Sequence, residues 1–366
     1  MSFLAERMGC IDASGIRKVF ALAAEMKNPI NLSIGQPDYD VDDEVKAVAI
    51  AAIQSGNNAY TQTWGNPDLR DAIVDYYARR FNAPFPNPMV TSGVSGGLYL
   101  ALLACVNPGD EVLFADPFFV MYPHLTRLLG GKPVPIDTYP HFKLTPELVE
   151  AHLTPRSKIL IVNSPSNPTG VTLTREELQA LADVAKKHNL LLISDEIYES
   201  LSYDGEPATM AGMYENTIIL NGLSKSAGMT GWRIGFASAP EAIIQAMNTL
   251  QQYTFVCAPA PAQKAAVKAL AMDMSDKVAA YREKRDIIFE GLRDTFEVTK
   301  PGGAFYIFPK VPRGTGSDFV KEAIANNLLI IPGGVFSARD SHFRISFAAK
   351  NETLRAGIEV LRRLAE

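Results

Sequence analysis

The chain has 366 residues, of which 47% are hydrophobic and 20% charged, and its formal net charge is −5. At roughly 150 residues per domain, this length suggests two to three domains. The composition is that of a globular protein with a large core and excludes a mainly disordered chain. The slightly acidic balance argues against nucleic acid or an anionic membrane surface as a partner.

The cysteines and the N-terminal segment bear on the compartment. Cys10, Cys105 and Cys257 are odd in number and lie far apart, so the sequence indicates neither a disulfide framework nor a zinc site. Glu6 and Arg7 interrupt the N-terminal segment before an apolar stretch of signal-peptide length builds up. No uncharged apolar run approaches the ~20 residues that span a bilayer. We therefore expect a cytoplasmic protein without a membrane span.

Short apolar runs alternate with turns and with stretches of helical period. The runs cover residues 111–115, 133–137, 159–163, 190–194 and 217–221. Each is apolar almost throughout, which favours strands buried on both faces of a mostly parallel sheet. Between them, residues 174–188 form a helix candidate that begins with a capping box, Thr174 and Glu177. This alternation predicts an α/β fold with helices on both sheet faces.

The pattern changes near residue 265. A long charged amphipathic helix is predicted over 275–296, followed by short alternating strands at 304–308 and 343–347 and a terminal helix at 351–364. We expect a large domain at 36–270 and a smaller α+β domain formed by the two chain ends, 1–35 and 271–366.

Polar residues follow several of the apolar runs directly. Because parallel sheets bind ligands at the carboxyl ends of their strands, these residues are candidates for one site. The segments are NSPSNPTG at 163–170, SDEIY at 194–198 and NGLSKS at 221–226, and upstream TSGVSGG at 91–97 leads into a predicted helix. Together they bring an amide, a carboxylate, a phenol, a lysine and a glycine-rich helix N-terminus to one sheet edge.

Three of these residues have a structural alternative. Asp195 closes an apolar strand and is either a site carboxylate or the N-cap of a following helix. Tyr198, about one helical turn later, either faces the same site or is a core aromatic. Asn167 precedes Pro168 and is either a site residue or part of a turn.

The cationic residues are more specific. Lys225 lies just past a buried strand, where desolvation lowers the pKa of an amine and makes it a nucleophile for Schiff-base chemistry. The 93–97 loop suits a phosphate bound by backbone N–H groups, although it matches neither the P-loop nor the dinucleotide motif. Arg233 follows Lys225 by eight residues and would add positive charge there.

Arg344 lies in an otherwise apolar predicted strand, FRISF at 343–347. A buried guanidinium requires an anion, which is either an internal carboxylate or that of a ligand. The five histidines have no metal-ligand spacing, and hydrolase motifs are absent, so we expect no metal site.

Taken together, NPTG at 167–170, SDEIY at 194–198 and SKSAGMTGWRIG at 224–235 resemble the pyridoxal 5′-phosphate (PLP) enzymes of fold type I. The closest resemblance is to the class I/II aminotransferases related to aspartate and aromatic aminotransferases, and it extends from LSIGQPD at 32–38 to the strand of Arg344. It implies a large PLP-binding domain with a mostly parallel central sheet flanked by helices. It also implies a homodimer with shared active sites.

The resemblance assigns cofactor roles. Lys225 would bind PLP covalently and move protons, and Asp195 would keep the pyridine nitrogen protonated. Tyr198 and Asn167 would bond the 3-oxygen. The remaining cofactor contacts implied are Phe119 on the ring, Ser224, Arg233 and the backbone of Val94 and Ser95 on the phosphate, and Tyr60 on the phosphate of the neighbouring subunit.

The resemblance also assigns substrate roles. Arg344 would bind the α-carboxylate in a two-pronged pair, assisted by Asn167 and the backbone of Gly35. Trp64 and residues 14–16 would line the side-chain pocket, compatible with aromatic or aliphatic donors. Ser95 departs from subgroups that carry lysine there, and no second arginine is placed against a side-chain carboxylate.

The implied function is a ping-pong transaminase that moves the amino group of an L-amino acid to a 2-oxo acid such as 2-oxoglutarate. A PLP-dependent C–S β-lyase is the alternative enzyme. A non-enzymatic ligand-sensing domain is disfavoured, because no basic helix-turn-helix precedes residue 30, where the resemblance begins.

Overall fold

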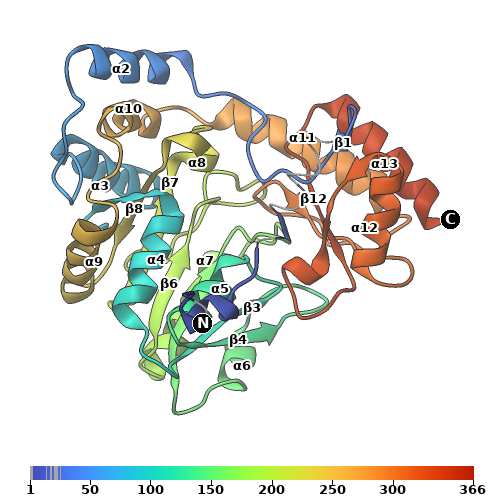
Figure 1. The fold of residues 1–366 in the computed structure, drawn as a ribbon, viewed down its shortest axis with the longest axis horizontal. Helices are drawn as coiled ribbons and strands as arrows, with labels where there is room; N and C mark the ends of the chain where they lie inside the picture. Colours follow the sequence, from blue (N-terminus) through green and yellow to red (C-terminus); the bar gives the residue numbers. More distant parts are fainter. Residues whose placement is uncertain (1–2, 14, 17–18, 20–23, 25) are drawn as a thin grey trace.

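The computed structural model describes residues 3–13, 15–16, 19, 24 and 26–366. Its centre is a seven-stranded sheet in the order β2-β8-β7-β6-β5-β3-β4 (Figure 1). The strands are β2 (Met89–Ser92), β3 (Glu111–Asp116), β4 (Lys132–Asp137), β5 (Ser157–Asn163), β6 (Leu191–Asp195), β7 (Thr217–Gly222) and β8 (Ile234–Ser238). β8 pairs antiparallel with both of its neighbours, and the remaining pairs are parallel.

The five predicted apolar runs are the five strands β3 to β7, with ends that differ by at most two residues. Strands β2 and β8 were not predicted. β2 is short and follows a proline-rich stretch, and β8 begins inside the glycine-rich motif around Arg233. The prediction of an α/β fold with a mostly parallel sheet is confirmed.

Strand side chains alternate between the two faces of the sheet, and here those on both faces are apolar. Helices therefore cover both faces. In β5, Ile159 and Ile161 pack in the same cluster as residues of α4, α5 and α9, whereas Leu160 and Val162 pack with residues of α2, α3, α7 and α10. These helices are α2 (Asp43–Gln54), α3 (Pro67–Phe81), α4 (Gly93–Cys105), α5 (Met121–Leu128), α7 (Arg175–Lys187), α9 (Glu241–Thr254) and α10 (Ala260–Leu270).

Helix α7 begins where the sequence predicts. The hydroxyl of Thr174 accepts a hydrogen bond from the backbone N–H of Glu177 (3.2 Å), and the Glu177 carboxylate accepts one from the N–H of Thr174 (2.8 Å). The predicted capping box is therefore confirmed. A short helix, α6 (Pro146–Glu150), packs against α7.

The C-terminal part forms a second core beside the sheet, drawn in orange and red in Figure 1. Its helices are α11 (Ser275–Leu292), α12 (Gly316–Ala325) and α13 (Asn351–Ala365), and its strands are β9 (Tyr306–Ile307), β10 (Leu328–Leu329), β11 (Ile331–Pro332) and β12 (Phe343–Ser346). Strand β1 (Ile30–Asn31) pairs with β10, so an N-terminal segment joins this C-terminal part. The domain limits at 35/36 and 270/271 stay a prediction.

Short 3-10 helices complete the described part: η1 (Glu6–Cys10), η2 (Thr230–Trp232) and η3 (Gly333–Val335). Within that part, no helix combines the length and the hydropathy required to cross a bilayer.

Candidate active site

A cavity of about 480 Å³ lies at the carboxyl ends of β5 and β6, beside the N-terminus of α4. Most of the residues predicted for the site line it: Gly35, Val94, Ser95, Phe119, Asn167, Asp195, Tyr198, Ser224, Lys225, Arg233 and Arg344. Ile16 also lines it, whereas Ser14 lies outside the described residues. Segments that are distant in the chain therefore meet around one space.

Asp195 is the last residue of β6 and is 3% exposed. Its carboxylate accepts hydrogen bonds from the Tyr122 hydroxyl (2.7 Å) and from the backbone N–H of Ile197 (3.3 Å). Burial raises the pKa of Asp195 to about 6, against the lowering effect of these two bonds. A turn follows β6, so Asp195 is not a helix N-cap. A buried carboxylate that faces a cavity favours a cationic N–H ligand.

Lys225 lies on the four-residue helix α8 (Leu223–Ser226), directly after β7. Its amine donates a hydrogen bond to the carbonyl of Gly35 (2.6 Å) and lies 5.8 Å from the centres of the Tyr198 and Phe305 rings. Burial, together with the nearby positive charge of Arg344, lowers the pKa of Lys225 to about 8. At this pKa about a tenth of the amine is uncharged at pH 7, far more than for an ordinary lysine, and the uncharged form is the one that attacks a carbonyl.

The N-terminus of α4 and Arg233 form a cradle for an anion. The first N–H groups of α4, including those of Val94 and Ser95 on the cavity wall, have no partner inside the helix. Gly93 has a φ of +69°, and a Cβ there would lie 2.3 Å from Nη2 of Arg233. At Gly235, a Cβ would lie 2.6 Å from the backbone nitrogen of Val94. These two glycines allow the guanidinium and the helix terminus to approach each other closely.

Arg344 is in β12 and is 1% exposed. Its guanidinium donates to the side-chain oxygen of Asn167 (3.0 Å) and to the carbonyl of Ser33 (3.0 Å), while its Nε has no partner. The guanidinium carbon lies 4.4 Å from the ring centre of Tyr306 and 4.6 Å from that of Phe336. Among the described residues, no carboxylate forms an ion pair with it, so the structural alternative, an internal ion pair, is absent there.

Tyr198 shares a hydrogen bond with Tyr306 (2.9 Å between the hydroxyl oxygens) and is 4% exposed. Burial raises the pKa of Tyr198 well above 10, so its phenol stays protonated. The sequence left open whether Tyr198 is a core aromatic or faces the site. In the structure it does both, because its ring packs in the second core and it also lines the cavity.

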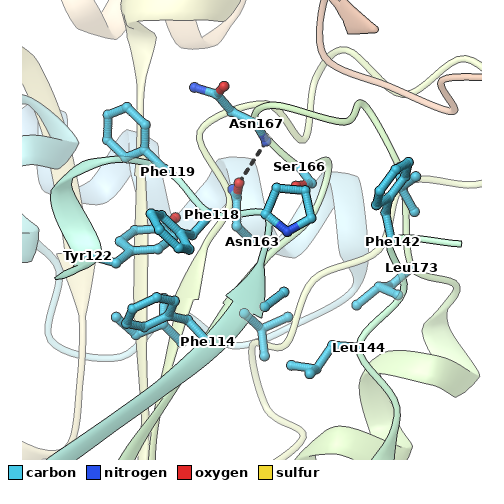
Figure 2. A pocket seen from close by; sticks show the side chains of 15 residues that line it. Phe114, Phe118, Phe119, Tyr122, Phe142, Leu144, Asn163, Ser166, Asn167 and Leu173 are labelled. Carbon is cyan, nitrogen blue, oxygen red and sulfur yellow. Dashed lines mark hydrogen bonds between the residues drawn. The ribbon is translucent and has the colours of Figure 1, made fainter. Parts of the chain in front are cut away.

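Asn163 and Asn167 form a wall of the cavity. Figure 2 shows the backbone N–H of Asn167 bonded to the side chain of Asn163 (3.0 Å) beside Phe119. Behind this wall lies a separate pocket of only about 30 Å³, lined largely by aromatic and aliphatic side chains. Because so little free space lies behind it, the wall has little room to move.

Two predicted residues do not line the cavity. Tyr60 is 84% exposed, and Trp64 packs against the core cluster of α4 and α9, with Arg70 5.5 Å from its ring centre. Their predicted roles, in a neighbouring subunit and in the side-chain pocket, stay predictions.

Two tyrosines at the site, Tyr122 and Tyr306, were not predicted from the sequence. Tyr122 lies one helical turn after Phe119, and this spacing was the available signal. Tyr306 lies in β9, where its residue partner across the ladder is Ser346, two residues after Arg344. That pairing joins segments about forty residues apart in the chain, so no pattern among neighbouring residues could have predicted it.

Comparisons with known proteins identify the family of this chain. The family model "Aminotransferase class I and II" matches residues 27–361. The aspartate/prephenate aminotransferase of Cereibacter sphaeroides is 38% identical, over 97% of this chain and 96% of the relative. Aromatic-amino-acid aminotransferase 2 of Thermococcus litoralis is 35% identical, over 97% and 96%. The structure of Thermus thermophilus aspartate aminotransferase with maleate superposes with a TM-score of 0.96 at 34% identity, covering 100% of both chains.

The fold and these matches define a PLP-dependent enzyme of fold type I. The chain belongs to the class I and II aminotransferases and is a transaminase.

Proposed function

We propose that this transaminase binds PLP in the 480 Å³ cavity and uses it to transfer the amino group of an L-amino acid to a 2-oxo acid. The observation that carries the proposal is the joint placement of a half-buried amine of lowered pKa, Lys225, and a buried carboxylate, Asp195, in one cavity. The charged lining residues are Lys225, Arg233, Arg344 and Asp195, an excess of positive charge that suits an anionic cofactor and an anionic substrate.

The residues present fit PLP in chemical type. Lys225 would bind the aldehyde carbon, and the carboxylate of Asp195 would hold the proton on the ring nitrogen. The α4 terminus, Ser224 and Arg233 would hold the phosphate. The phenol of Tyr198 and the amide of Asn167 would bond the 3-oxygen, and Phe119 would cover the ring. When bound, the cofactor supplies an electron sink for the charge that develops at the substrate Cα.

The chain itself supplies the acid–base chemistry. The amine of Lys225 would accept the proton from the substrate Cα and pass it to the cofactor carbon to which that amine had been bound, and its pKa, lowered to about 8, suits this exchange near physiological pH. Arg344 binds the α-carboxylate with two charge-assisted hydrogen bonds and thereby fixes Cα relative to that amine. The aromatic rings around Lys225 exclude water from the proton transfer.

The cavity wall nearest Arg344 suggests the class of donor. Ile16 and Val120 line the cavity and pack in the same cluster as Phe336, whose ring covers the Arg344 guanidinium. The cations on the described cavity lining besides Arg344 are Lys225 and Arg233, which have cofactor roles. We therefore propose amino donors with apolar, aromatic or aliphatic side chains, and 2-oxoglutarate as the acceptor to test first.

We also propose a homodimer and a cytoplasmic location. Tyr60 is 84% and Tyr253 85% exposed, and their segments are joined by a hydrogen bond from Gln251 to the carbonyl of Thr63 (2.7 Å). Adjacent exposed aromatics are typical of an interface. The three cysteines are free thiols, which supports a reducing compartment.

The test is reconstitution of the purified protein with PLP, followed by borohydride reduction and peptide mapping. We expect visible absorbance and a modified Lys225. The reconstituted protein is then given a donor without an acceptor. A single stoichiometric conversion supports transamination, whereas continuous release of pyruvate and ammonia from a cysteine conjugate supports a β-lyase. A protein that stays colourless contradicts the proposal.

A further inference from the structure

A buried carboxylate next to Asp195 has no role in the chemistry proposed above. Glu196 follows Asp195 in the chain and is 2% exposed, but strand alternation turns it to the opposite face of the sheet, toward α3. Among the described residues, no cation forms an ion pair with it. Burial raises the pKa of Glu196 to about 7, and only hydrogen bonds, in place of a counter-ion, favour its charged form.

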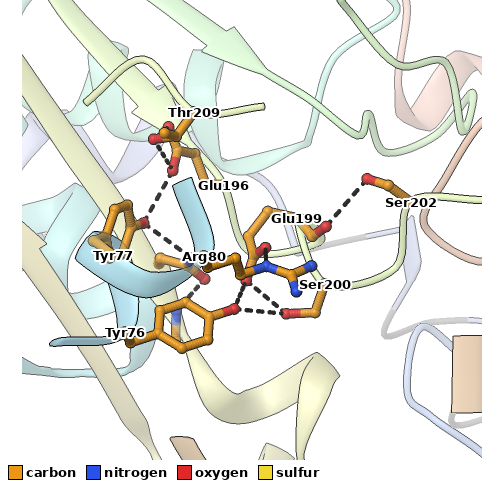
Figure 3. A network of polar contacts seen from close by, with 10 residues as sticks. Tyr76, Tyr77, Arg80, Glu196, Glu199, Ser200, Ser202 and Thr209 are labelled. Carbon is orange, nitrogen blue, oxygen red and sulfur yellow. Dashed lines mark hydrogen bonds and ion pairs between the residues drawn. The ribbon is translucent and has the colours of Figure 1, made fainter. Parts of the chain in front are cut away.

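Glu196 accepts hydrogen bonds from four groups. They are the hydroxyls of Ser194 (2.9 Å), Thr209 (2.9 Å to either oxygen) and Tyr77 (3.0 Å) and the backbone N–H of Met210 (3.0 Å). Every partner donates, so the site is built for a carboxylate acceptor. Figure 3 shows Glu196 between Tyr77 and Thr209.

Tyr77 connects this carboxylate to the segment of Lys225. Its hydroxyl donates to Glu196 and accepts a hydrogen bond from the side-chain N–H of Asn221 (3.1 Å). The side-chain oxygen of Asn221 accepts from the backbone N–H of Gly222 (2.6 Å), and Lys225 follows three residues later. The ring of Tyr77 is 0% exposed, with the Phe85 ring centre 4.2 Å away, so the hydroxyl is fixed in place.

The hydrogen bonds through Glu196, Tyr77 and Asn221 lie just beyond the last backbone pair of strands β6 and β7. Residue pairing between β6 and β7 ends at Asp195 with Leu220, and one further bond runs from the N–H of Glu196 to the carbonyl of Leu220 (2.8 Å). Asn221 and Gly222, the last residues before α8, lie beyond this pairing. On their other side both residues remain paired with β8, at Phe236 and Gly235. The bonds through Tyr77 add a side-chain link from them to the strand end of Asp195.

We propose that Glu196, Tyr77 and Asn221 form a positioning relay that fixes the helix carrying Lys225 relative to the strand end carrying Asp195. The relay acts through position alone, since its members lie on the opposite side of the sheet from the cavity and none of them lines it. The inference rests on the proposed roles of Lys225 and Asp195.

A neighbouring network offers a matched control. Tyr76, the preceding residue of α3, donates its hydroxyl to Glu199, which is 3% exposed and paired with Arg80 (2.7 Å). Figure 3 shows this second network around Glu199, Arg80 and Ser200. Tyr76→Phe therefore removes the same atom, from the same helix, next to a similarly buried carboxylate that does not contact Asn221.

The test compares Tyr77→Phe with Tyr76→Phe in the PLP-reconstituted enzyme. For Tyr77→Phe we expect kcat to fall roughly 10- to 100-fold, because the amine of Lys225 would no longer be held in place. The donor KM should stay within about twofold of wild type. The rate at which Lys225 captures added PLP in stopped-flow absorbance should slow by about tenfold. For Tyr76→Phe we expect kcat and the capture rate within about twofold of wild type.

The outcomes separate the relay from simple stability and from the proposed function. Equal losses in both variants, or a lower melting temperature for Tyr77→Phe with unchanged kcat and capture rate, overturn the relay. If wild type itself neither captures PLP nor turns over, the proposed function fails instead. Glu196→Gln is the second variant. The N–H₂ group of its amide would face a hydroxyl that now donates to the carboxylate, so this variant should show the same loss of kcat and of capture rate as Tyr77→Phe.

Discussion

Replacing Arg344 by lysine tests the carboxylate anchor without removing its positive charge. The guanidinium is held by Asn167 and Ser33 and lies between the rings of Tyr306 and Phe336, so its planar fork is fixed before substrate arrives. A lysine at this position keeps the charge but presents no second N–H in the plane of a carboxylate.

The magnitude follows from the bonds lost. A hydrogen bond to a charged group contributes about 1.5–3 kcal/mol, and the variant loses one of two. A loss of about 2 kcal/mol lowers kcat/KM roughly 30-fold. Because every amino donor and every 2-oxo acid carries the same carboxylate, the loss should be similar for all of them and should appear mainly in KM.

Steady-state kinetics on a panel of donors measures this effect, with phenylalanine and 2-phenylethylamine as a diagnostic pair. The amine lacks the carboxylate. Arg344→Lys should therefore lower kcat/KM for phenylalanine and leave the weak activity toward 2-phenylethylamine unchanged. Arg285→Lys is the matched control, since Arg285 is 2% exposed but pairs with Asp204 (2.6 Å) away from the cavity. A KM increase confined to one donor, or an equal loss in Arg285→Lys, would refute the reasoning.

Three further predictions concern the cofactor site. Lys225→Ala should abolish turnover and the absorbance that arises from the covalent bond between residue 225 and PLP, while leaving the circular dichroism spectrum unchanged; retained turnover would contradict its role. Asp195→Asn should still bind PLP but lose most turnover. In the PLP-free protein, burial raises the pKa of Asp195 from 3.8 to about 6, so the folded form retains a proton that the unfolded chain releases between these pH values. Wild type should therefore lose about 2 kcal/mol of unfolding free energy relative to Asp195→Asn as pH rises from 4 to 6, measured by urea titration. An unchanged difference across that range would show that Asp195 titrates normally. Gly93→Ala should weaken binding of PLP, measured by equilibrium dialysis, since the new Cβ meets Arg233 and the backbone has φ +69°; unchanged binding would argue against the cradle.

The sequence predicted the elements whose signals are local. Strands β3 to β7 were recognisable because residues buried on both faces leave uninterrupted apolar runs, and the start of α7 was recognisable from Thr174 and Glu177. Lys225 and Arg344 were recognisable because a cation beside or inside a buried strand needs a specific partner. These signals require only neighbouring residues.

What the sequence did not indicate depends on contacts between distant segments. The hydroxyls of Tyr198 and Tyr306 meet across 108 positions, and the amine of Lys225 meets the carbonyl of Gly35 across 190. The bond between Tyr122 and Asp195 spans 73 positions. Tyrosine is equally suited to a core or to a site, so its role is decided by the partner of its hydroxyl, which only the folded chain supplies.

The way Arg344 is held has a practical consequence for handling the enzyme. An amide and a carbonyl orient the guanidinium but do not neutralise it, so in the proposed function the substrate carboxylate would be its counter-ion. Small monocarboxylates in a buffer carry the group that pairs with a guanidinium and are expected to bind at the same place. Acetate or formate at high concentration should compete with donor and acceptor alike, and kinetic constants for this protein are best compared in buffers whose anions are too large or too weakly binding to enter.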